Sequence, residues 1–155
     1  MSRGTLLLVA LLLSVPLLSG CVSNDEPQGK EQDLRFAVEL STASLQPGES
    51  VTIRLTLRSI SPAPVTITFT SGKRADVLIT NPTTADQPYS FSADKSYPPG
   101  QTRVTIPEFS TIILVEAVWD GRYTNGTDVP SAEYRVLAQV ADHHDWVASR
   151  FLTIQ

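Results

Sequence analysis

The stretch VTIRLTLR (Val51–Arg58) decides the fold, because its apolar and polar residues alternate without interruption. Successive side chains of a β-strand point to opposite faces, so this alternation places the four aliphatic residues together on one face. The intervening threonines and arginines face water. Valine, isoleucine and threonine also fit a pleated, half-buried surface well. The segment therefore predicts a strand that buries one face.

The same period-two pattern recurs on both sides of this stretch, and no segment shows a sustained helical period. The further strands that we predict are Leu34–Leu40, Val65–Thr70, Ala75–Asn81, Tyr89–Ser92, Thr102–Ile106, Thr111–Trp119, Glu133–Ala141 and Val147–Ile154. Turn-forming clusters such as Gln46–Glu49 and Pro98–Gly100 separate them. Short strands at this spacing indicate an all-β fold, specifically an antiparallel β-sandwich of immunoglobulin-like topology. We expect its core to include Phe36, Leu55, Phe69, Trp119, Tyr134 and Val136.

The N-terminal region predicts export. Leu6–Leu18 is apolar and follows Arg3, as in a secretory signal peptide. Ser19-Gly20-Cys21 closes the run and resembles the lipobox of prokaryotic lipoproteins, which implies cleavage before Cys21 and a lipid on its sulfur. A plain secretory signal and a retained transmembrane helix are the alternatives, although the apolar run is short for a helix that spans a bilayer. Cys21 is the only cysteine, so an intramolecular disulfide is excluded.

The chain therefore divides into three parts: a lipoprotein signal peptide (1–20), a lipidated flexible tether (21–32) and one β-sandwich domain (33–155). The expected location is the extracytoplasmic face of a cell membrane or outer membrane, held there by the lipid on Cys21. The formal net charge is −4 and the chain has no basic cluster. A nucleic-acid partner is therefore not expected.

The sequence offers no recognisable catalytic apparatus, so we predict neither an enzyme nor a cofactor. His143-His144-Asp145 is the cluster that most resembles a metal site. Adjacent strand residues point to opposite faces, and a third ligand would have to come from elsewhere in the chain. We therefore favour a polar hairpin tip over a metal site. Asn125-Gly126-Thr127 matches a glycosylation sequon and is interpreted as a turn.

Three clusters of residues recur in a known order and spacing. They are Ser71-Gly72 with Asp76, the segment Tyr89–Tyr97 with Lys95, and Trp119-Asp120 followed by Val129-Pro130 and Tyr134-Arg135-Val136. Together they resemble the BsuPI family, small β-rich domains named after an intracellular proteinase inhibitor. The chain departs from the family pattern at Ala75, where an aromatic residue is usual, at Tyr89, where tryptophan is common, and at Asp94, where glycine is common.

The resemblance implies an immunoglobulin-like fold and a role in proteinase inhibition. We interpret its motif residues as structural: Ser71, Gly72, Asp76, Lys95, Trp119, Asp120 and Tyr134. Lys95 has two alternatives, a cation–π contact with a nearby aromatic ring or an ion pair with Asp76 or Asp120.

Two loops are candidates for binding a partner. The first comprises Tyr97, Pro98, Pro99 and Gly100, and the second is Asp120–Ala132. A loop stiffened by prolines can lie in a substrate groove as an extended strand with a small ordering cost. We therefore expect a membrane-anchored protein-binding domain that inhibits or modulates a protease. The alternatives are a non-inhibitory structural or assembly module of the cell envelope and, less favoured, a ligand carrier.

Overall fold

The computed structural model describes residues 31–155. The predicted signal peptide, Cys21 and most of the predicted tether lie outside the described residues. A short 3-10 helix, η1 (Glu31–Asp33), leads into the first strand. Within residues 31–155, no helix has the length and apolar character needed to span a membrane.

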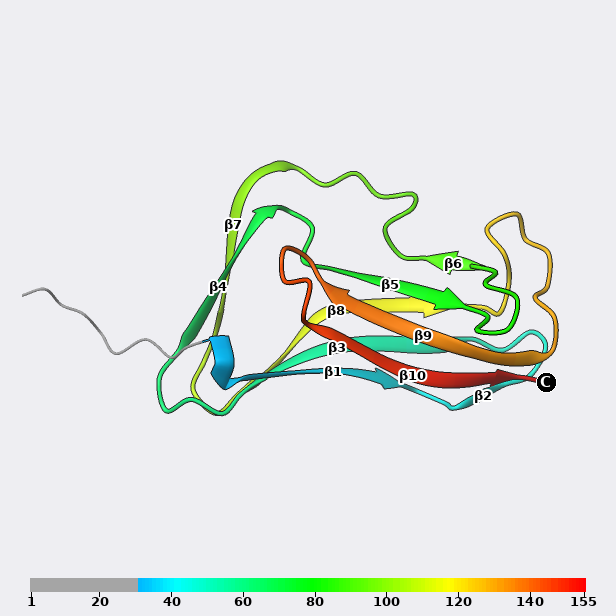
Figure 1. The fold of residues 1–155 in the computed structure, drawn as a ribbon, viewed down its shortest axis with the longest axis horizontal. Coiled ribbons are helices and arrows are strands. Elements are labelled where there is room, and N and C mark those ends of the chain that lie inside the picture. The colour runs from blue at the N-terminus through cyan, green and yellow to red at the C-terminus, as the bar shows by residue number, and fades with distance from the viewer. Residues whose placement is uncertain (1–30) are drawn as a thin grey trace, which may run out of the picture.

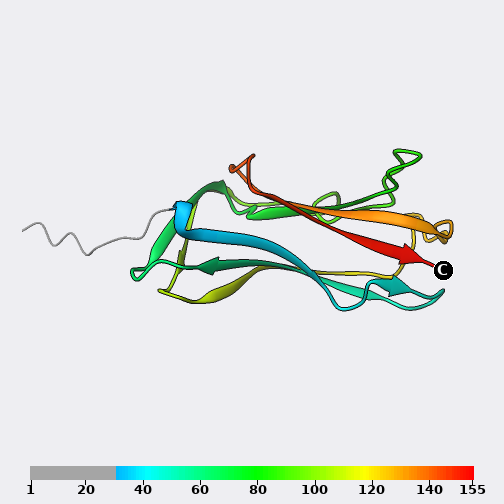
Figure 2. The ribbon, with the colours of Figure 1, turned by 60° about the horizontal axis from the view of Figure 1, so that its bottom comes forward.

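Two sheets pack face to face, and a two-stranded arm extends from one end of the sandwich (Figures 1 and 2). The first sheet has the order β1 (Leu34–Leu40), β3 (Val51–Ser59), β8 (Thr111–Trp119). The second has the order β2 (Ser44–Leu45), β10 (Val147–Ile154), β9 (Ala132–Val140), β5 (Ala75–Thr80), β6 (Tyr89–Ser90). The arm consists of β4 (Val65–Ser71) and β7 (Pro99–Ile106).

The connectivity is that of an immunoglobulin-like sandwich. After β1 in the first sheet, the chain contributes β2 to the second sheet, where β2 runs parallel to β10. The other paired strands are antiparallel. Tyr134, near the start of β9, donates a hydrogen bond from its hydroxyl to the carbonyl oxygen of Pro130 at 3.0 Å. This is the tyrosine corner of such sandwiches. The predicted all-β antiparallel sandwich is therefore confirmed.

The inward faces of both sheets form one apolar core. Most of the residues that the sequence places in the core are fully buried, namely Leu55, Phe69, Trp119, Tyr134 and Val136. Phe36 is only partly buried. It pairs with Leu57 on the inward face, but β1 is an edge strand, so one side of the Phe36 ring stays open.

Strand boundaries differ from the predicted ones where the chain turns. β6 ends at Ser90 because Ala93 and Lys95 donate backbone hydrogen bonds back to Ser90 and Ser92, which closes consecutive turns. β7 begins at Pro99, three residues earlier than predicted; proline is tolerated as the first residue of a strand. β2 was not predicted, since two residues are too few to display an alternating pattern.

Candidate functional site

Asp76 lies at the centre of a small polar cluster at the start of β5. Its Oδ2 accepts hydrogen bonds from Lys73 Nζ at 2.7 Å and from the Ser92 hydroxyl, and its Oδ1 accepts one from the backbone N–H of Val77 at 2.9 Å. Lys73 Nζ also donates to the Ser92 hydroxyl at 3.1 Å. We call Lys73, Asp76 and Ser92 the Asp76 cluster. It joins the start of β5 to the connection between β6 and β7.

The Asp76 cluster holds its carboxylate in the ionised form. Burial by itself raises the pKa of Asp76, but the hydrogen bonds from Lys73 and Ser92, the charge of Lys73 and the Val77 N–H outweigh it. The net effect lowers the pKa of Asp76 below its ordinary value. The Asp76 side chain is only 20% exposed, so water screens these contacts incompletely.

Gly72 is in direct contact with the segment Tyr97–Gly100, which we call the proline loop. The Gly72 N–H donates to the carbonyl oxygen of Pro98 at 3.0 Å. A Cβ atom at position 72 would lie 2.7 Å from Pro98 Cδ, so the contact requires glycine there. On the other side of the loop, Thr102 Oγ1 donates to the carbonyl oxygen of Ser71 at 2.8 Å, and Ser71 pairs with Pro99. The Ser71-Gly72 turn thus fixes the backbone of the loop.

The tip of the proline loop faces solvent. Pro98, Pro99 and Gly100 are exposed, and Gly100 has a φ of +106°, a conformation that favours glycine. Tyr97 differs from the other three residues because its side chain is partly buried and its hydroxyl is enclosed without a hydrogen-bond partner in the described structure. Burial raises the pKa of Tyr97. Three of the four predicted binding residues are therefore available to a partner.

Lys95 makes the cation–π contact, which was one of its two predicted roles. Its Nζ lies 3.8 Å from the centroid of the Phe91 ring and donates to the Phe91 carbonyl oxygen at 2.7 Å. Its ion-pair partner is Asp94 at 3.6 Å, rather than Asp76 or Asp120. Lys73 takes the place beside Asp76.

Trp119 and Tyr134 act as packing residues between the sheets. The Trp119 ring lies 6.1 Å from that of Tyr134 and 6.4 Å from that of Tyr89, and its Nε1 donates to the Arg122 carbonyl oxygen at 2.8 Å. Asp120 accepts a hydrogen bond from the Arg122 N–H at 3.2 Å and so shapes the turn that follows β8.

An ion pair and a hydrogen bond hold the second candidate loop, Asp120–Ala132, in place. Arg122 pairs with Asp128 at 3.0 Å across the loop. The Tyr123 hydroxyl donates to the carboxylate of Asp86 in the β5–β6 connection. This hydrogen bond, with burial and the Asp86 charge, raises the pKa of Tyr123 to about 12.

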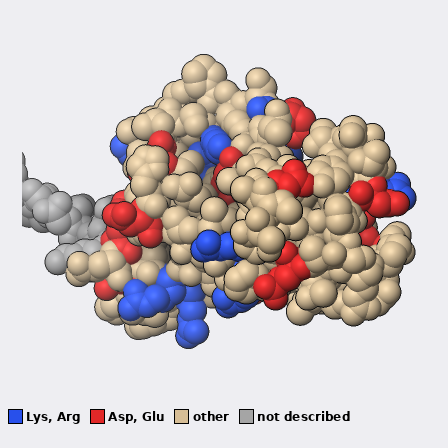
Figure 3. All heavy atoms as spheres, turned by 45° about the vertical axis from the view of Figure 1, so that its right-hand side comes forward, with Lys and Arg blue, Asp and Glu red and all other residues tan. Residues whose placement is uncertain are grey.

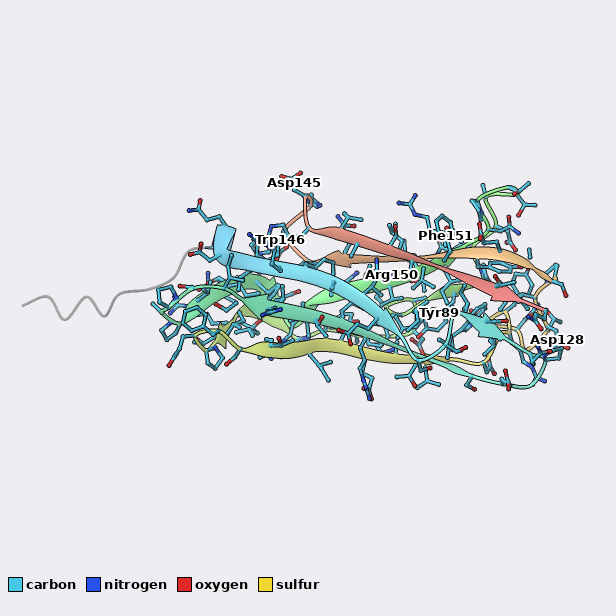
Figure 4. The ribbon with its side chains drawn as sticks, turned by 90° about the horizontal axis from the view of Figure 1, so that it is seen from below. Tyr89, Asp128, Asp145, Trp146, Arg150 and Phe151 are labelled. Carbon is cyan, nitrogen blue, oxygen red and sulfur yellow. The ribbon has the colours of Figure 1, made fainter. Side chains whose placement is uncertain are left out.

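The two histidines point to different surroundings. The His143 ring stacks on Trp146 with centroids 4.6 Å apart, meets the edge of Phe69 and places Nδ1 3.6 Å from a Glu31 oxygen. His144 Nδ1 instead lies 3.4 Å from Gln139 Nε2. Among residues 31–155, no three histidine, cysteine or acidic side chains gather as a metal site would require. Figure 4 shows Asp145 at the outer tip of this turn, with Trp146 beside β1.

A concavity of about 280 Å³ opens beside the Asp76 cluster, on the outer face of β5 and β9. Lys73, Asp76, Gln139, Asp142 and His144 form its polar side. Its volume lies just below that of ordinary small-molecule pockets, and it opens to the surface rather than between the sheets. It therefore suits a side chain of a partner protein better than a carried ligand.

Three residues of this region could not be identified as site residues from the sequence. Lys73 and Ser92 lie inside two of the recurring motif segments, and this is the only sequence feature that indicates that the two side chains come into contact. Asp142 accepts hydrogen bonds from the backbone N–H of Thr70 at 2.7 Å and from its hydroxyl, so it ties the β9–β10 turn to the arm. These hydrogen bonds lower the pKa of Asp142.

A sequence model of the BsuPI family, described as intracellular proteinase inhibitor, matches residues 36–144. The chain belongs to the BsuPI family. The match spans the Asp76 cluster, the proline loop and the tyrosine corner. The family is described as one of inhibitors rather than enzymes.

The family description corrects the expected location. An intracellular proteinase inhibitor meets its target inside the cell, whereas a lipid-anchored exported chain is separated from that compartment by a membrane. The predicted location at the extracytoplasmic face of a cell or outer membrane is therefore wrong. The predicted signal peptide and the lipid on Cys21 fall outside the described residues and stay predictions.

Comparison with curated proteins gives no match. Among solved structures, a β-glucosidase from Erythrobacter marinus is 13% identical with a TM-score of 0.46, and the alignment covers 79% of this chain and 15% of that one. The CARDB domain of a Pyrococcus furiosus protein is 10% identical with a TM-score of 0.43, covering 79% and 88%. A sporulation control protein from Bacillus subtilis is 11% identical with a TM-score of 0.44, covering 79% and 49%. None of these similarities bears on function.

Proposed function

We propose that this chain is a proteinase inhibitor that contacts its target protease through the proline loop. The observation that carries the proposal is the contact between Gly72 and Pro98, which we call the clamp, since it fixes the loop backbone while Pro99 and Gly100 remain exposed. Membership of the inhibitor family supports a protease as the partner.

The clamp favours tight binding for an entropic reason. Ordering a free backbone costs about 1–2 kcal/mol per residue, and a loop that is already ordered does not incur this cost on binding. The Asp76 cluster contributes by anchoring the chain at Ser92, five residues before the loop begins. The loop thus reaches a protease groove in one conformation, without rearrangement.

The concavity beside the Asp76 cluster offers a second contact for the partner. It presents Lys73 and Asp142 around an apolar floor that includes Leu78 and Leu137. A partner side chain that entered this concavity would supplement the backbone contacts of the loop.

The test is a titration of the full chain against subtilisin-like, trypsin-like and metalloproteases, with residual activity as the readout. We expect saturable, stoichiometric loss of activity with one protease class. The double variant Pro98→Ala/Pro99→Ala should weaken inhibition at least about tenfold, because a tenfold change corresponds to only about 1.4 kcal/mol. Pro107→Ala is the matched control, since Pro107 is an exposed proline at the opposite end of β7.

Full activity of every protease, with the chain folded by circular dichroism, would contradict inhibition. It would leave a protein-binding module that does not inhibit. Equal inhibition by the double variant and the parent chain would instead remove the proline loop from the contact while preserving the inhibitor assignment.

A further inference from the structure

β8 is an open edge strand. In the described structure it pairs with β3 alone, and the first sheet ends there. β7, the strand that precedes β8 in the chain, pairs with β4 in the arm instead of lying beside β8. Figure 1 shows β4 and β7 together at one end, away from the far half of β8. Alternate backbone N–H and C=O groups of β8 therefore point away from β3, towards a position that an added strand can occupy.

A bulge divides β8 into two unequal halves. Leu55 pairs with Val115 and Thr56 with Ile113, so Leu114 is an extra residue on β8. A bulge distorts the edge and hinders the addition of another strand there. The segment beyond it, Val115–Trp119, continues in regular register with β3 as far as the pair Val51–Trp119. This second half is the part of the edge suited to pairing.

A trough of about 400 Å³ lies at the end of this second half. Val118 and Trp119 form one wall, Tyr89 and Ser90 of β6 form another, and Arg122–Thr124 close the end. Figure 1 shows the β8–β9 connection rising beside β6 at this end of the sandwich. Val118 is 60% exposed, so it offers an apolar contact to an incoming strand at this wall of the trough.

The charge of the trough selects the direction of an incoming strand. Asp94 and Asp120 line it. Asp94 lies 3.6 Å from Lys95, and the cation among the lining residues, Arg122, is paired with Asp128, so Asp120 is the lining carboxylate that makes no ion pair with a lysine or arginine in the described structure. A strand antiparallel to β8 would bring its N-terminal end to this acidic trough, whereas a parallel strand would bring its C-terminal end. A positive N-terminus is favoured beside carboxylates and a negative C-terminus is repelled.

From these observations we propose that the open edge of β8 binds an extended peptide, antiparallel, with a positively charged N-terminal end in the trough. Backbone hydrogen bonds to Val115–Trp119 provide the pairing, and an apolar side chain packs beside Val118 and Tyr89. This site is separate from the proline loop, and the proposal does not depend on protease inhibition.

The test uses a synthetic probe with the full chain. The probe is Val-Thr-Val-Thr-Val-Gly with a free α-amino group and fluorescein at its carboxyl end, and binding is followed by fluorescence polarisation. N-acetylation should weaken binding about fivefold, because an exposed charge pair contributes modestly. Methylation of alternate backbone nitrogens should abolish binding, since it removes the donors that pair with β8.

Two matched variants locate the binding site. Val118→Lys places a positive charge beside the trough and should weaken binding about tenfold or more. Ile113→Lys is the control, because Ile113, at 54% exposure, is a similarly exposed residue of β8 on the other side of the bulge. Both positions face solvent, so both variants should fold, which circular dichroism will check. Pro99→Ala should leave probe binding unchanged, which separates this site from the inhibitor proposal.

Three results would overturn the proposal: no polarisation change up to millimolar protein, equal binding of the N-methylated probe, or equal loss from both lysine variants. A fourth is a dimer in sedimentation that Val118→Lys dissociates and that excludes the probe. In that case a second copy of this chain, rather than a foreign peptide, occupies the edge.

Discussion

Replacing Asp76 with asparagine tests the polar cluster that anchors the proline loop. Asparagine keeps the size of the side chain and the oxygen that accepts from Val77, but it removes the negative charge and the second oxygen, Oδ2, which accepts from both Lys73 and Ser92. Hydrogen bonds to a charged group contribute roughly 1.5–3 kcal/mol each when buried. The Lys73 and Asp76 side chains are 33% and 20% exposed, so solvent reduces this value. We expect Asp76→Asn to lower the free energy of unfolding by about 2 kcal/mol.

The pH dependence of this loss identifies its cause. Because the fold lowers the pKa of Asp76, the ionised carboxylate stabilises the protein above the unfolded pKa of about 3.9, and the stabilisation disappears as pH falls through the lower folded pKa. The difference between the parent chain and the variant should therefore be constant from pH 7 to about pH 5 and shrink below pH 4.

The assay is urea unfolding at a series of pH values, followed by the fluorescence of Trp119 and Trp146. Asp94→Asn is the control, since the Asp94 side chain is 82% exposed and contacts Lys95 at 3.6 Å; its unfolding midpoint should match that of the parent. A difference between parent and Asp76→Asn that persists undiminished at pH 2 would refute the electrostatic explanation. A difference below about 0.5 kcal/mol at pH 7 would refute the cluster as an anchor, because ordinary surface substitutions lie in that range.

Three further outcomes follow from the described contacts. Gly72→Ala should lower the free energy of unfolding by about 1–3 kcal/mol, because its Cβ would overlap the Pro98 ring. Urea unfolding measures this change. An unchanged midpoint would show that the proline loop can move away from position 72 at no cost in stability. Tyr134→Phe should cost about 1 kcal/mol by removing the hydrogen bond to Pro130, which thermal unfolding will detect. Since the pKa of Tyr123 is raised to about 12, its contribution to stability is present below about pH 10 and is lost as pH rises through 12. Tyr123→Phe should accordingly remove phenolate absorbance that appears near pH 12, and a loss of absorbance near pH 10 instead would contradict the Asp86 contact.

Much of the fold could be predicted from local pattern. Val51–Arg58 becomes β3 almost unchanged, because a strand with one buried face imposes strict alternation on its residues. Tyr134 was recognised as a structural residue through its motif, and the tyrosine corner gives it that role. Phe36 was placed correctly on the inward face, but the open side of β1 could not be read from alternation, which does not reveal which strands lie at an edge.

The candidate site was predictable only in part. Pro98, Pro99 and Gly100 were selected from composition, and the structure exposes all three; their role in binding stays a prediction. The partner of Asp76 was not found, because Lys95, which lies far from Asp76 along the chain, was considered instead of the nearby Lys73, and only the turn after β6 decides which ammonium reaches the carboxylate. The surface charges show the same limit: Figure 3 shows basic and acidic side chains scattered over one face between broad uncharged areas, an arrangement that net charge does not specify.

The sequence alone determined the all-β class, the approximate strands and the family-like motifs, because side-chain alternation and turn residues act over short distances along the chain. Only the tertiary structure decided that β7 leaves the sandwich to pair with β4, that β8 therefore has an open edge, and that Gly72 clamps Pro98. These features depend on which strands pair over long sequence separations. That choice is settled by packing of the whole core, and short segments do not encode it.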